Sequence, residues 1–254
     1  MDALILAAGF GSRLREVEPC KPLTRLHSLS LLEIAVRQLA SVGVTRVVVA
    51  TGYLADEIEA ALPSIAELAG ILVEARRVQD YNLPNGHSVL AGAAGFSGEF
   101  LLVMADHLFS RQVLQALVDR GVPDHGVVLA IDRRVDSPLV DPDDATWVET
   151  GDDGRIRKIG KSITRYDAVD CGAFLATPAL LAAIASAIAG GKAGSLSEGM
   201  QRLADDGRAW TTDIDGAWWI DVDDARDLEL ARQQVTEQCP ELFASDEFQG
   251  SVPA

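Results

Sequence analysis

Short runs of consecutive apolar residues alternate with helical patterns along the first half of the chain. The runs that predict buried strands are residues 3–7, 46–50, 71–74, 100–104 and 127–131. Apolar residues at helical spacing predict helices over residues 29–41, 55–62 and 88–95. Because strands that alternate with helices build a mainly parallel sheet covered by helices, we predict an α/β fold.

The pattern loosens after residue 132, where residues 136–144 are rich in Asp and Pro. The elements predicted beyond that point are a hairpin over residues 147–159 that turns at Asp152-Asp153-Gly154, a strand over 168–176, an alanine-rich helix over 179–189, an apolar run over 217–222 and a helix over 224–236. We interpret residues 1–236 as a single domain with halves 1–132 and 133–236. Residues 237–254 are predicted to be a flexible tail.

The composition is that of a globular protein, with 48% hydrophobic and 24% charged residues in a chain of 254. Its 38 acidic and 22 basic residues give a formal net charge of −16. Nucleic acids and anionic membranes are themselves negative, so this charge argues against both as partners. A polyphosphate bound to so acidic a protein would need a divalent metal to offset the repulsion.

The cysteines and the apolar segments indicate a compartment. The three cysteines are widely spaced and form no Cys-x-x-Cys pair, so neither a disulfide framework nor a zinc site is predicted, and a reducing cytoplasm fits. No basic stretch precedes the first apolar run, which argues against a cleaved signal peptide. Residues 179–189 are far short of the roughly 20 residues of a membrane span. We expect a soluble cytoplasmic protein.

The first apolar run ends in a glycine loop that carries two cations. Gly9 and Gly11 lack a Cβ, so their backbone can wrap closely around an anion. Arg13 suits a bidentate phosphate contact, and Lys21 suits a point charge on a phosphate whose bond is breaking. Leu14 replaces the third glycine of the dinucleotide fingerprint, and no Gly-Lys-Ser/Thr follows, which excludes a P-loop. A plain turn with two solvated cations remains the alternative.

Two aspartates at the ends of distant apolar runs are candidate metal ligands. Asp106 follows the run at residues 100–104, and Asp221 ends the run that begins at residue 217. Ligands of open α/β sheets gather at the carboxyl ends of strands, and magnesium prefers oxygen ligands. Asp106 could instead be a helix cap before residue 110. Asp223 or Asp224 could cap the helix over residues 224–236 while Asp221 binds the metal, and from the residues alone these roles could be exchanged.

The string L-A-A-G-x-G-S-R-L followed by P-x-K-P-L resembles the nucleotidyltransferase family that joins nucleoside triphosphates to sugar phosphates and phospho-alcohols. The N-G-x-S motif at Asn85–Ser88 resembles the base and ribose loop of the cytidylyltransferase branch. The motifs at residues 103–107, 141–146, 159–174 and 219–223 together resemble the CTP:inositol-1-phosphate cytidylyltransferases. Cys171, where that family commonly has threonine, and a trimmed region around Pro84 depart from the pattern.

The resemblance implies a Rossmann-like three-layer nucleotidyltransferase fold with a mixed, mainly parallel sheet. It selects Asp221, with Asp106, as a ligand of Mg²⁺. Expected catalytic residues are Arg13, Lys21 and Asp106. Expected nucleotide-binding residues are Leu6, Ala7, Ala8, Gly9, Gly11, Ser12, Arg13, Lys21, Asn85, Gly86, Ser88 and Asp106. Expected acceptor-binding residues are His107, Lys161, Asp167 and Asp170, because a lysine can pair with a phosphate and carboxylates can accept hydrogen bonds from polyol hydroxyls.

The reaction implied is the transfer of CMP from CTP to inositol 1-phosphate, with attack of the acceptor phosphate on the α-phosphorus and release of pyrophosphate. In the resembling family the domain is often fused to a membrane enzyme that consumes CDP-inositol, so here such a partner would be a separate protein. The alternatives are a transferase of the same fold that acts on phosphocholine, a phosphonate or a sugar 1-phosphate, and a non-catalytic nucleotide-sensing subunit.

Overall fold

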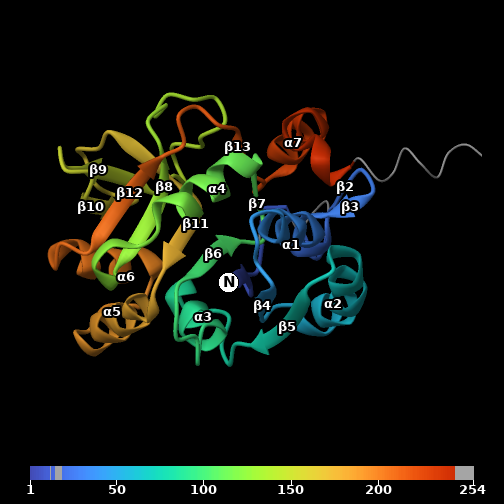
Figure 1. The fold of residues 1–254 in the computed structure, drawn as a ribbon, viewed down its shortest axis with the longest axis horizontal. Coiled ribbons are helices and arrows are strands. Elements are labelled where there is room, and N and C mark those ends of the chain that lie inside the picture. Colours follow the sequence, from blue (N-terminus) through green and yellow to red (C-terminus); the bar gives the residue numbers. More distant parts are fainter. Residues whose placement is uncertain (12, 15–18, 244–254) are drawn as a thin grey trace, which may run out of the picture.

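A mixed nine-stranded sheet crosses the computed structural model, which describes residues 1–11, 13–14 and 19–243 (Figure 1). Its strands are β1 (Asp2–Ala7), β4 (Arg46–Thr51), β5 (Leu72–Arg77), β6 (Phe100–Met104), β8 (Val127–Asp132), β9 (Trp147–Thr150), β10 (Ile156–Gly160), β11 (Ala168–Ala176) and β12 (Ala209–Asp213). The order is β10-β9-β11-β6-β1-β4-β5, with β8 paired to β11 and β12 paired to β8. Two small sheets pair β2 (Arg25–Leu26) with β3 (Leu29–Ser30) and β7 (His107–Phe109) with β13 (Trp219–Asp221).

The sheet changes character at the junction of β6 and β11. Strand β1 lies between β4 and β6 and is parallel to both, and β5 extends this parallel part. Strand β11 is antiparallel to β6, β8 and β9. Parallel strands buried on both faces read as continuous apolar runs, which is why the sequence predicts β1, β4 and β6 well. The edge strand β5 is half-exposed and carries Glu74, Arg76 and Arg77, so its last residues were not predicted.

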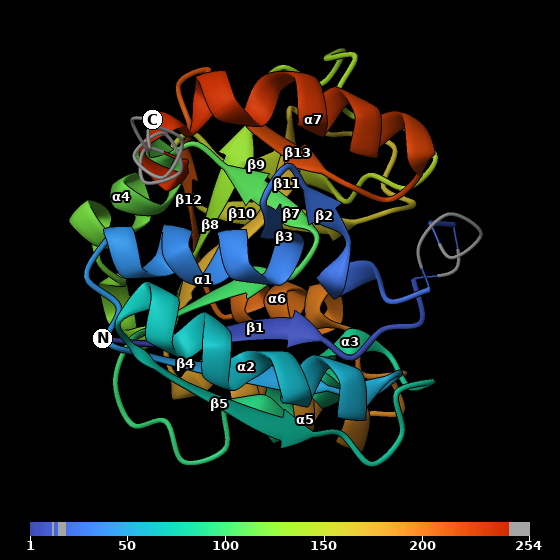
Figure 2. The same ribbon diagram turned by 90° about the vertical axis from the view of Figure 1, so that its right-hand side faces the viewer.

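Helices cover both faces of the sheet, so the three-layer α/β architecture is confirmed. One face is covered by α1 (Leu31–Ser41), α2 (Ala55–Ala69) and α4 (Arg111–Arg120), and the other by α3 (Asn85–Gly92), α5 (Pro178–Ala189) and α6 (Leu196–Asp205). Figure 2 shows α1 and α2 on the near face, with α5 and α6 behind the sheet. Helix α7 (Ala225–Gln238) packs with β13, β7 and the β2–β3 pair in a separate apolar cluster. Short 3-10 helices occupy Lys21–Leu23, Pro123–His125 and Pro240–Leu242.

Several element boundaries differ from the sequence prediction. Helix α2 continues past the expected end at residue 62 to Ala69. Pro63 lies inside it and does not end it. Helix α3 begins three residues earlier than expected, at Asn85, which places the N-G-x-S motif in its first turn rather than in a loop. The hairpin over residues 147–159 is confirmed by the antiparallel pair β9–β10. Helix α1 begins at Leu31 rather than at residue 29, because Leu29–Ser30 form β3 and Ser30 caps the helix. Strands β2, β3, β7 and β12 and helices α4 and α6 were not predicted.

The C-terminal part of the described chain is folded onto the core. Asp224 caps α7 and forms a capping box with Asp227, as expected for one of the two capping candidates. Residues 237–243 continue α7 and a 3-10 helix, and Cys239 and Leu242 are buried, so this part of the expected tail is ordered. Residues 244–254 lie outside the described residues. Among the helices that the structure describes, none has the length and apolar character needed to span a bilayer.

Candidate active site

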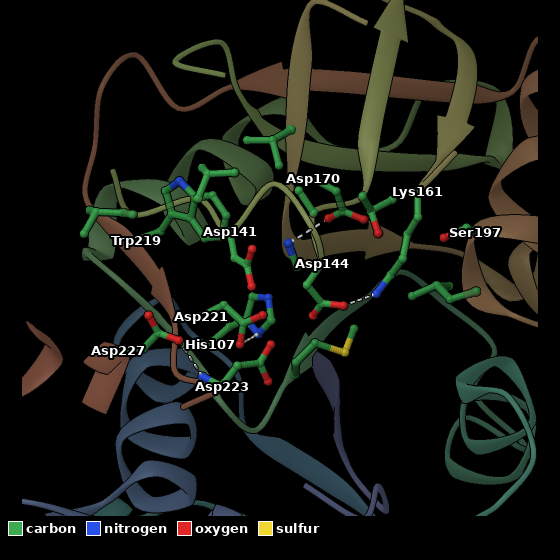
Figure 3. A pocket seen from close by; sticks show the side chains of 18 of the residues that line it. His107, Asp141, Asp144, Lys161, Asp170, Ser197, Trp219, Asp221, Asp223 and Asp227 are labelled. Atoms are coloured by element: carbon green, nitrogen blue, oxygen red, sulfur yellow. Dashed lines mark hydrogen bonds and ion pairs between the residues drawn. The ribbon is translucent and has the colours of Figure 1, made fainter. Parts of the chain in front are cut away.

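The carboxyl ends of the parallel strands open onto one cleft, which runs between the two halves of the sheet. Strand β1 delivers the glycine loop to this cleft, β6 delivers Asp106, and the segment after β5 delivers α3. The opposite wall comes from the loop before β9, from the residues after β10 and from the start of α6. Figure 3 shows carboxylates converging on this space from both walls. The layout agrees with the rule that open α/β sheets bind ligands at strand ends.

Lys21 is buried at the floor of the glycine loop, with only 8% of its surface exposed. Gly11 has a φ of +59°, and a Cβ there would lie 3.0 Å from Cβ of Lys21, so the loop needs a glycine at this point. Nζ of Lys21 lies 2.6 Å from Oδ2 of Asp106 and 2.5 Å from Oδ1 of Asp223. Burial alone would lower the pKa of Lys21, but the carboxylates of Asp106, Asp221 and Asp223 outweigh it and raise the pKa.

The short sheet β7–β13 brings residues from opposite ends of the chain together, with His107 paired to Asp221 in register. Nδ1 of His107 lies 2.9 Å from Oδ1 of Asp106 and 3.4 Å from Oδ1 of Asp221. Burial would lower the pKa of His107, yet the two carboxylates raise it to about 9. For Asp106, burial is outweighed by Lys21 and His107, which hold its pKa well below the usual range. Both groups are therefore charged at neutral pH.

Packing fixes the ring of His107 from two sides. The indole of Trp219 stacks on it at a centroid distance of 6.2 Å and an interplanar angle of 20°. The indole Nε1–H donates to Oδ2 of the buried Asp132 over 2.9 Å, which fixes the indole in turn. On another side, Gly172 has a φ of +76°, and a Cβ there would lie 2.3 Å from Cδ2 of His107. The imidazole is thus held against Asp106 by shape as well as by charge.

We expect Gly172→Ala to displace His107 and to lower both stability and turnover. An alanine at positive φ costs about 1–2 kcal/mol, and the clash with the imidazole adds to it. Gly154→Ala is the matched control, because Gly154 has a φ of +78° and no atom lies within 4 Å of the position that a Cβ would take there. Urea unfolding and turnover of both variants separate backbone strain from the contact. Equal effects of the two substitutions would contradict a role for Gly172 in positioning His107.

The carboxylates offer places for a divalent cation. Oxygens or nitrogens of Asp106, His107 and Asp221 lie within 4.8 Å of one another, and so do those of Asp144, Asp221 and Asp223. Oδ1 of Asp221 is buried and accepts no hydrogen bond, and burial with the charges of Asp106 and Asp223 raises the pKa of this carboxyl to about 8. Both oxygens of Asp223, in contrast, are paired with Lys21 and Arg13. A buried carboxylate oxygen that accepts no hydrogen bond and lies beside further carboxylates fits a hard cation.

Arg13 crosses the cleft to the Asp-rich segment before β9. Its Nη2 donates to Asp144 over 2.6 Å and to Asp223 over 2.7 Å, and its Nη1 donates to Asp141 over 3.5 Å. Lys161, at the end of β10, donates to the other oxygen of Asp144. Burial would raise the pKa of Asp144, but its hydrogen bonds with Lys161 and Arg13 lower it. The same aspartate therefore joins a cation from each half of the chain.

The far wall of the cleft combines one buried carboxyl with apolar and polar groups. Asp170 accepts from the backbone N–H of Gly172 over 2.7 Å, and burial raises its pKa to about 6. Lys161, Phe174 and Ser197 line the same space. Figure 3 shows Asp170 and Lys161 on the wall opposite His107 and Asp223. A ligand at this wall would meet a cation, hydrogen-bond acceptors and an apolar surface.

The first turn of α3 lies at the boundary of the two walls. Oδ1 of Asn85 accepts from the backbone N–H of Leu196 over 2.8 Å, which ties α3 to the start of α6. A Cβ on Gly86 would lie 2.3 Å from the carbonyl oxygen of Gly194, so the backbones approach too closely for any other residue. Ser88 is buried and, with Tyr81 and Leu83, lines the part of the cleft that also contains Gly9 of the glycine loop.

The structure brings most of the expected site residues together, but not all of them. Leu6, Ala8, Gly9, Asn85, Ser88, Asp106, His107 and Asp221 line one part of the cleft, and Ala7, Gly11 and Lys21 line its floor. Asp167 lies outside the lining residues. It accepts from Thr150 and Arg133 at the turn end of β9, and these hydrogen bonds lower its pKa against the effect of burial. Ser12 lies outside the described residues.

Sequence reasoning missed three carboxylates of this site. Asp223 was considered for a metal or a cap, whereas here it pairs with Lys21 and Arg13. Asp141 and Asp144 were noticed only as part of a motif and an Asp-rich stretch, without a role. The available signal was the concentration of aspartates at residues 136–144 and 221–224.

Comparison with known proteins agrees with this geometry. Residues 3–203 match the family described as "MobA-like NTP transferase domain", and the chain belongs to that family. It is 34% identical over 236 residues, 92% of its length, to a "Bifunctional IPC transferase and DIPP synthase" of Rubrobacter xylanophilus, and 32% identical over 175 residues, 69% of its length, to a protein of the same name from Archaeoglobus fulgidus. The chain spans 52% and 32% of these relatives, respectively.

A solved structure resembles the chain over almost its whole length. The inositol-1-phosphate CTP transferase from T. maritima superposes with a TM-score of 0.78 at 26% identity, covering 94% of this chain and 97% of that one. A UDP-glucose pyrophosphorylase superposes with a TM-score of 0.71 at 17% identity, which supports the fold alone. The resemblance to the inositol-1-phosphate cytidylyltransferases that the motifs predict is thereby confirmed.

Proposed function

We propose that this chain transfers CMP from CTP to inositol 1-phosphate, giving CDP-inositol and pyrophosphate. The observation that carries the proposal is a buried Lys21 among three carboxylates at the floor of a glycine loop, with a second lysine, Lys161, across the cleft. The likeness to the T. maritima inositol-1-phosphate CTP transferase and to the IPC transferases supports the choice of nucleotide and acceptor.

On the nucleotide side, the triphosphate would lie along the backbone of Gly9 and Gly11, between Arg13 and Lys21. The first turn of α3 would contact the base and ribose through Gly86, Ser88 and the amide of Asn85. Since Oδ1 of Asn85 accepts from Leu196, its Nδ2 hydrogens are the part that remains to donate to a ligand.

On the acceptor side, Lys161 would pair with the phosphate of inositol 1-phosphate. Asp170 would accept hydrogen bonds from ring hydroxyls, which phosphocholine lacks. His107, charged and fixed by Trp219 and Gly172, would stabilise negative charge between the two substrates. No general base is required, because the acceptor phosphate is already an anion near neutral pH.

Mg²⁺ is the metal that we propose for this site, with Asp106 and Asp221 as its protein ligands. Oδ1 of Asp221, which accepts no hydrogen bond, and the carboxylate of Asp106 suit its preference for oxygen, whereas both oxygens of Asp223 already pair with Lys21 and Arg13. When bound, the ion would neutralise charge on the phosphates of a protein whose formal net charge is −16.

The reaction would proceed by in-line displacement at the α-phosphorus. An oxygen of the acceptor phosphate forms the new bond, and the bond from the α-phosphorus to the bridging oxygen breaks. Pyrophosphate leaves toward Lys21 and Arg13, whose positive charges oppose the charge that develops on it. This chain's own residues therefore act by holding both substrates in line and by neutralising charge.

The cytoplasm is the compartment that we propose, because all three cysteines are free and two of them are buried. We further propose that a membrane enzyme consumes the CDP-inositol, and the names of the bifunctional relatives, which pair an IPC transferase with a DIPP synthase, support a coupled second activity.

The test is an acceptor panel. The purified chain is incubated with Mg²⁺ and CTP and with myo-inositol 1-phosphate, phosphocholine or glucose 1-phosphate in separate reactions. Pyrophosphate release and the mass of the CDP product are measured. We expect pyrophosphate release in the reaction that contains myo-inositol 1-phosphate and in neither of the other two. Release with another acceptor would overturn the acceptor assignment, and no release with any of them would contradict the reaction itself.

A further inference from the structure

One carboxylate, that of Asp144, neutralises a cation on each side of the cleft. Its Oδ2 accepts from Nη2 of Arg13 over 2.6 Å, and its Oδ1 accepts from Nζ of Lys161. Figure 3 shows the side chain of Asp144 reaching to that of Lys161. Arg13 belongs to the glycine loop after β1, whereas Lys161 follows β10 in the second half of the chain. No other aspartate among the described residues joins the two halves of the site in this way.

The two cations depend on Asp144 to different extents. Arg13 also pairs with Asp223 over 2.7 Å and with Asp141 over 3.5 Å, so it keeps carboxylate partners without Asp144. Lys161 has 60% of its side chain exposed and pairs with no further carboxylate in the part of the chain that the structure describes. Asp144 itself lies in the segment between β8 and β9, where its backbone N–H donates to the carbonyl of Asp141 over 3.2 Å. It belongs to neither strand and can turn away without disturbing the sheet.

We propose that Asp144 occupies the phosphate positions of both substrates and thereby couples their binding. This inference rests on the proposed function, in which Arg13 meets the triphosphate and Lys161 meets the acceptor phosphate. A phosphate at either cation competes with the carboxylate of Asp144. At Arg13 both hydrogens of Nη2 are already donated, to Asp144 and Asp223, and a phosphate at Lys161 would face the negative charge of Asp144. The cost of moving Asp144 therefore falls mainly on the first substrate to bind.

The coupling follows from the shared carboxylate. A phosphate at Arg13 removes one of the two cations that hold Asp144 and places negative charge beside it, so the remaining pair with Lys161 weakens. The acceptor phosphate then binds to a lysine that is easier to reach. The same holds in reverse, because a coupling free energy between two sites is reciprocal. Asp144 is therefore a positioning residue that acts through Arg13 and Lys161.

The experiment measures that coupling by calorimetry on the full chain. The ligands are an α,β-methylene analogue of CTP, which cannot release pyrophosphate, and myo-inositol 1-phosphate, both with Mg²⁺. The dissociation constant of each is measured alone and with the other at saturation. In the wild type we expect each ligand to tighten the other about fivefold or more. In Asp144→Asn we expect each ligand alone to bind more tightly and the coupling factor to fall toward one.

Asp143→Asn is the matched control. Asp143 lies in the same segment, is exposed and carries the same charge, but its side chain pairs with neither Arg13 nor Lys161 among the described residues. This variant is expected to leave acceptor affinity and the coupling factor at their wild-type values. Circular dichroism and urea unfolding check that both variants are folded. A coupling factor that falls equally in both variants would mean a general loss of negative charge, and it would overturn the proposal.

Inorganic triphosphate separates this inference from the proposed function. If Asp144→Asn binds triphosphate more tightly than the wild type does while inositol 1-phosphate fails to bind either, the role of Asp144 is supported and the acceptor assignment is wrong. If both substrates bind but Asp144→Asn keeps the wild-type affinities and coupling, the role of Asp144 is overturned and the function stands. If triphosphate binds the two proteins equally and neither substrate binds, both are overturned.

Discussion

Replacing Asp106 by asparagine is expected to lower turnover by on the order of a thousandfold while the fold is kept. Asparagine keeps the shape of the side chain but removes the charge that faces Lys21, His107 and the proposed metal. A loss of about 4 kcal/mol in transition-state stabilisation corresponds to that factor. The fold should survive because Lys21 retains its pair with Asp223.

The measurement for Asp106→Asn is Mg²⁺-dependent pyrophosphate release with CTP and inositol 1-phosphate, together with urea unfolding. Asp119→Asn is the control, because Asp119 is exposed on α4 and contacts only the neighbouring Gln115 in the described residues. It should behave like the wild type in both assays. Near-normal release by Asp106→Asn would remove Asp106 from the proposed metal ligands and from catalysis.

The parts of the site that could be predicted from the sequence are those in which chemistry and local structure share one segment. The glycine loop needs residues without a Cβ where its backbone lies close to its own cation. Gly11 and Lys21 are only ten residues apart in the sequence, so one short motif contains both and predicts their contact. Asp106 directly follows a strand that is buried on both faces, and its place at the strand end follows from that run. Both predictions rest on residues close together in the sequence, and the structure places these residues as the sequence indicates.

The parts that could not be predicted depend on pairing between distant segments. His107 and Asp221 face each other only because β7 and β13 pair, and three-residue strands are too short to leave a periodic pattern. Asp167 and Asp170 looked equivalent in the sequence. A register shift in the β11–β8 pairing beyond Asp170 and the positive φ of Gly172 place Asp170 in the cleft, whereas Asp167 bonds to the β9–β10 hairpin.

Replacing Lys21 by methionine is expected to abolish turnover and to destabilise the protein by about 3 kcal/mol or more at pH 8. Methionine fills much of the same space, but it leaves Asp106, Asp221 and Asp223 without the cation that they share. Removing one partner of a buried ion pair leaves an uncompensated buried charge, which destabilises the folded state more than replacing both partners would. Lys158→Met, on the exposed side of β10, is the control and should be nearly neutral.

The loss of unfolding free energy in Lys21→Met should grow as the pH rises. In the wild type, Lys21 and His107 hold the pKa of Asp106 below its ordinary value, so the carboxylate contributes stability at neutral pH that is lost only in acid. In Lys21→Met, burial is no longer outweighed by the lysine, and the pKa of Asp106 rises. A carboxyl whose pKa in the folded state lies above its value in the unfolded chain stabilises the protein less as the pH rises. The difference in unfolding free energy between variant and wild type should therefore grow from pH 5.5 to pH 8.

The response to Mg²⁺ distinguishes this electrostatic effect from simple misfolding. Without the lysine, three carboxylates face one another and should attract a divalent cation more strongly than they do in the wild type, even without nucleotide. A ligand that binds the folded state alone stabilises it, so millimolar Mg²⁺ should raise the unfolding free energy of Lys21→Met at pH 8 more than that of the wild type. An equal response, or a loss of stability that does not change with pH, would show that Lys21 supports the fold by packing alone.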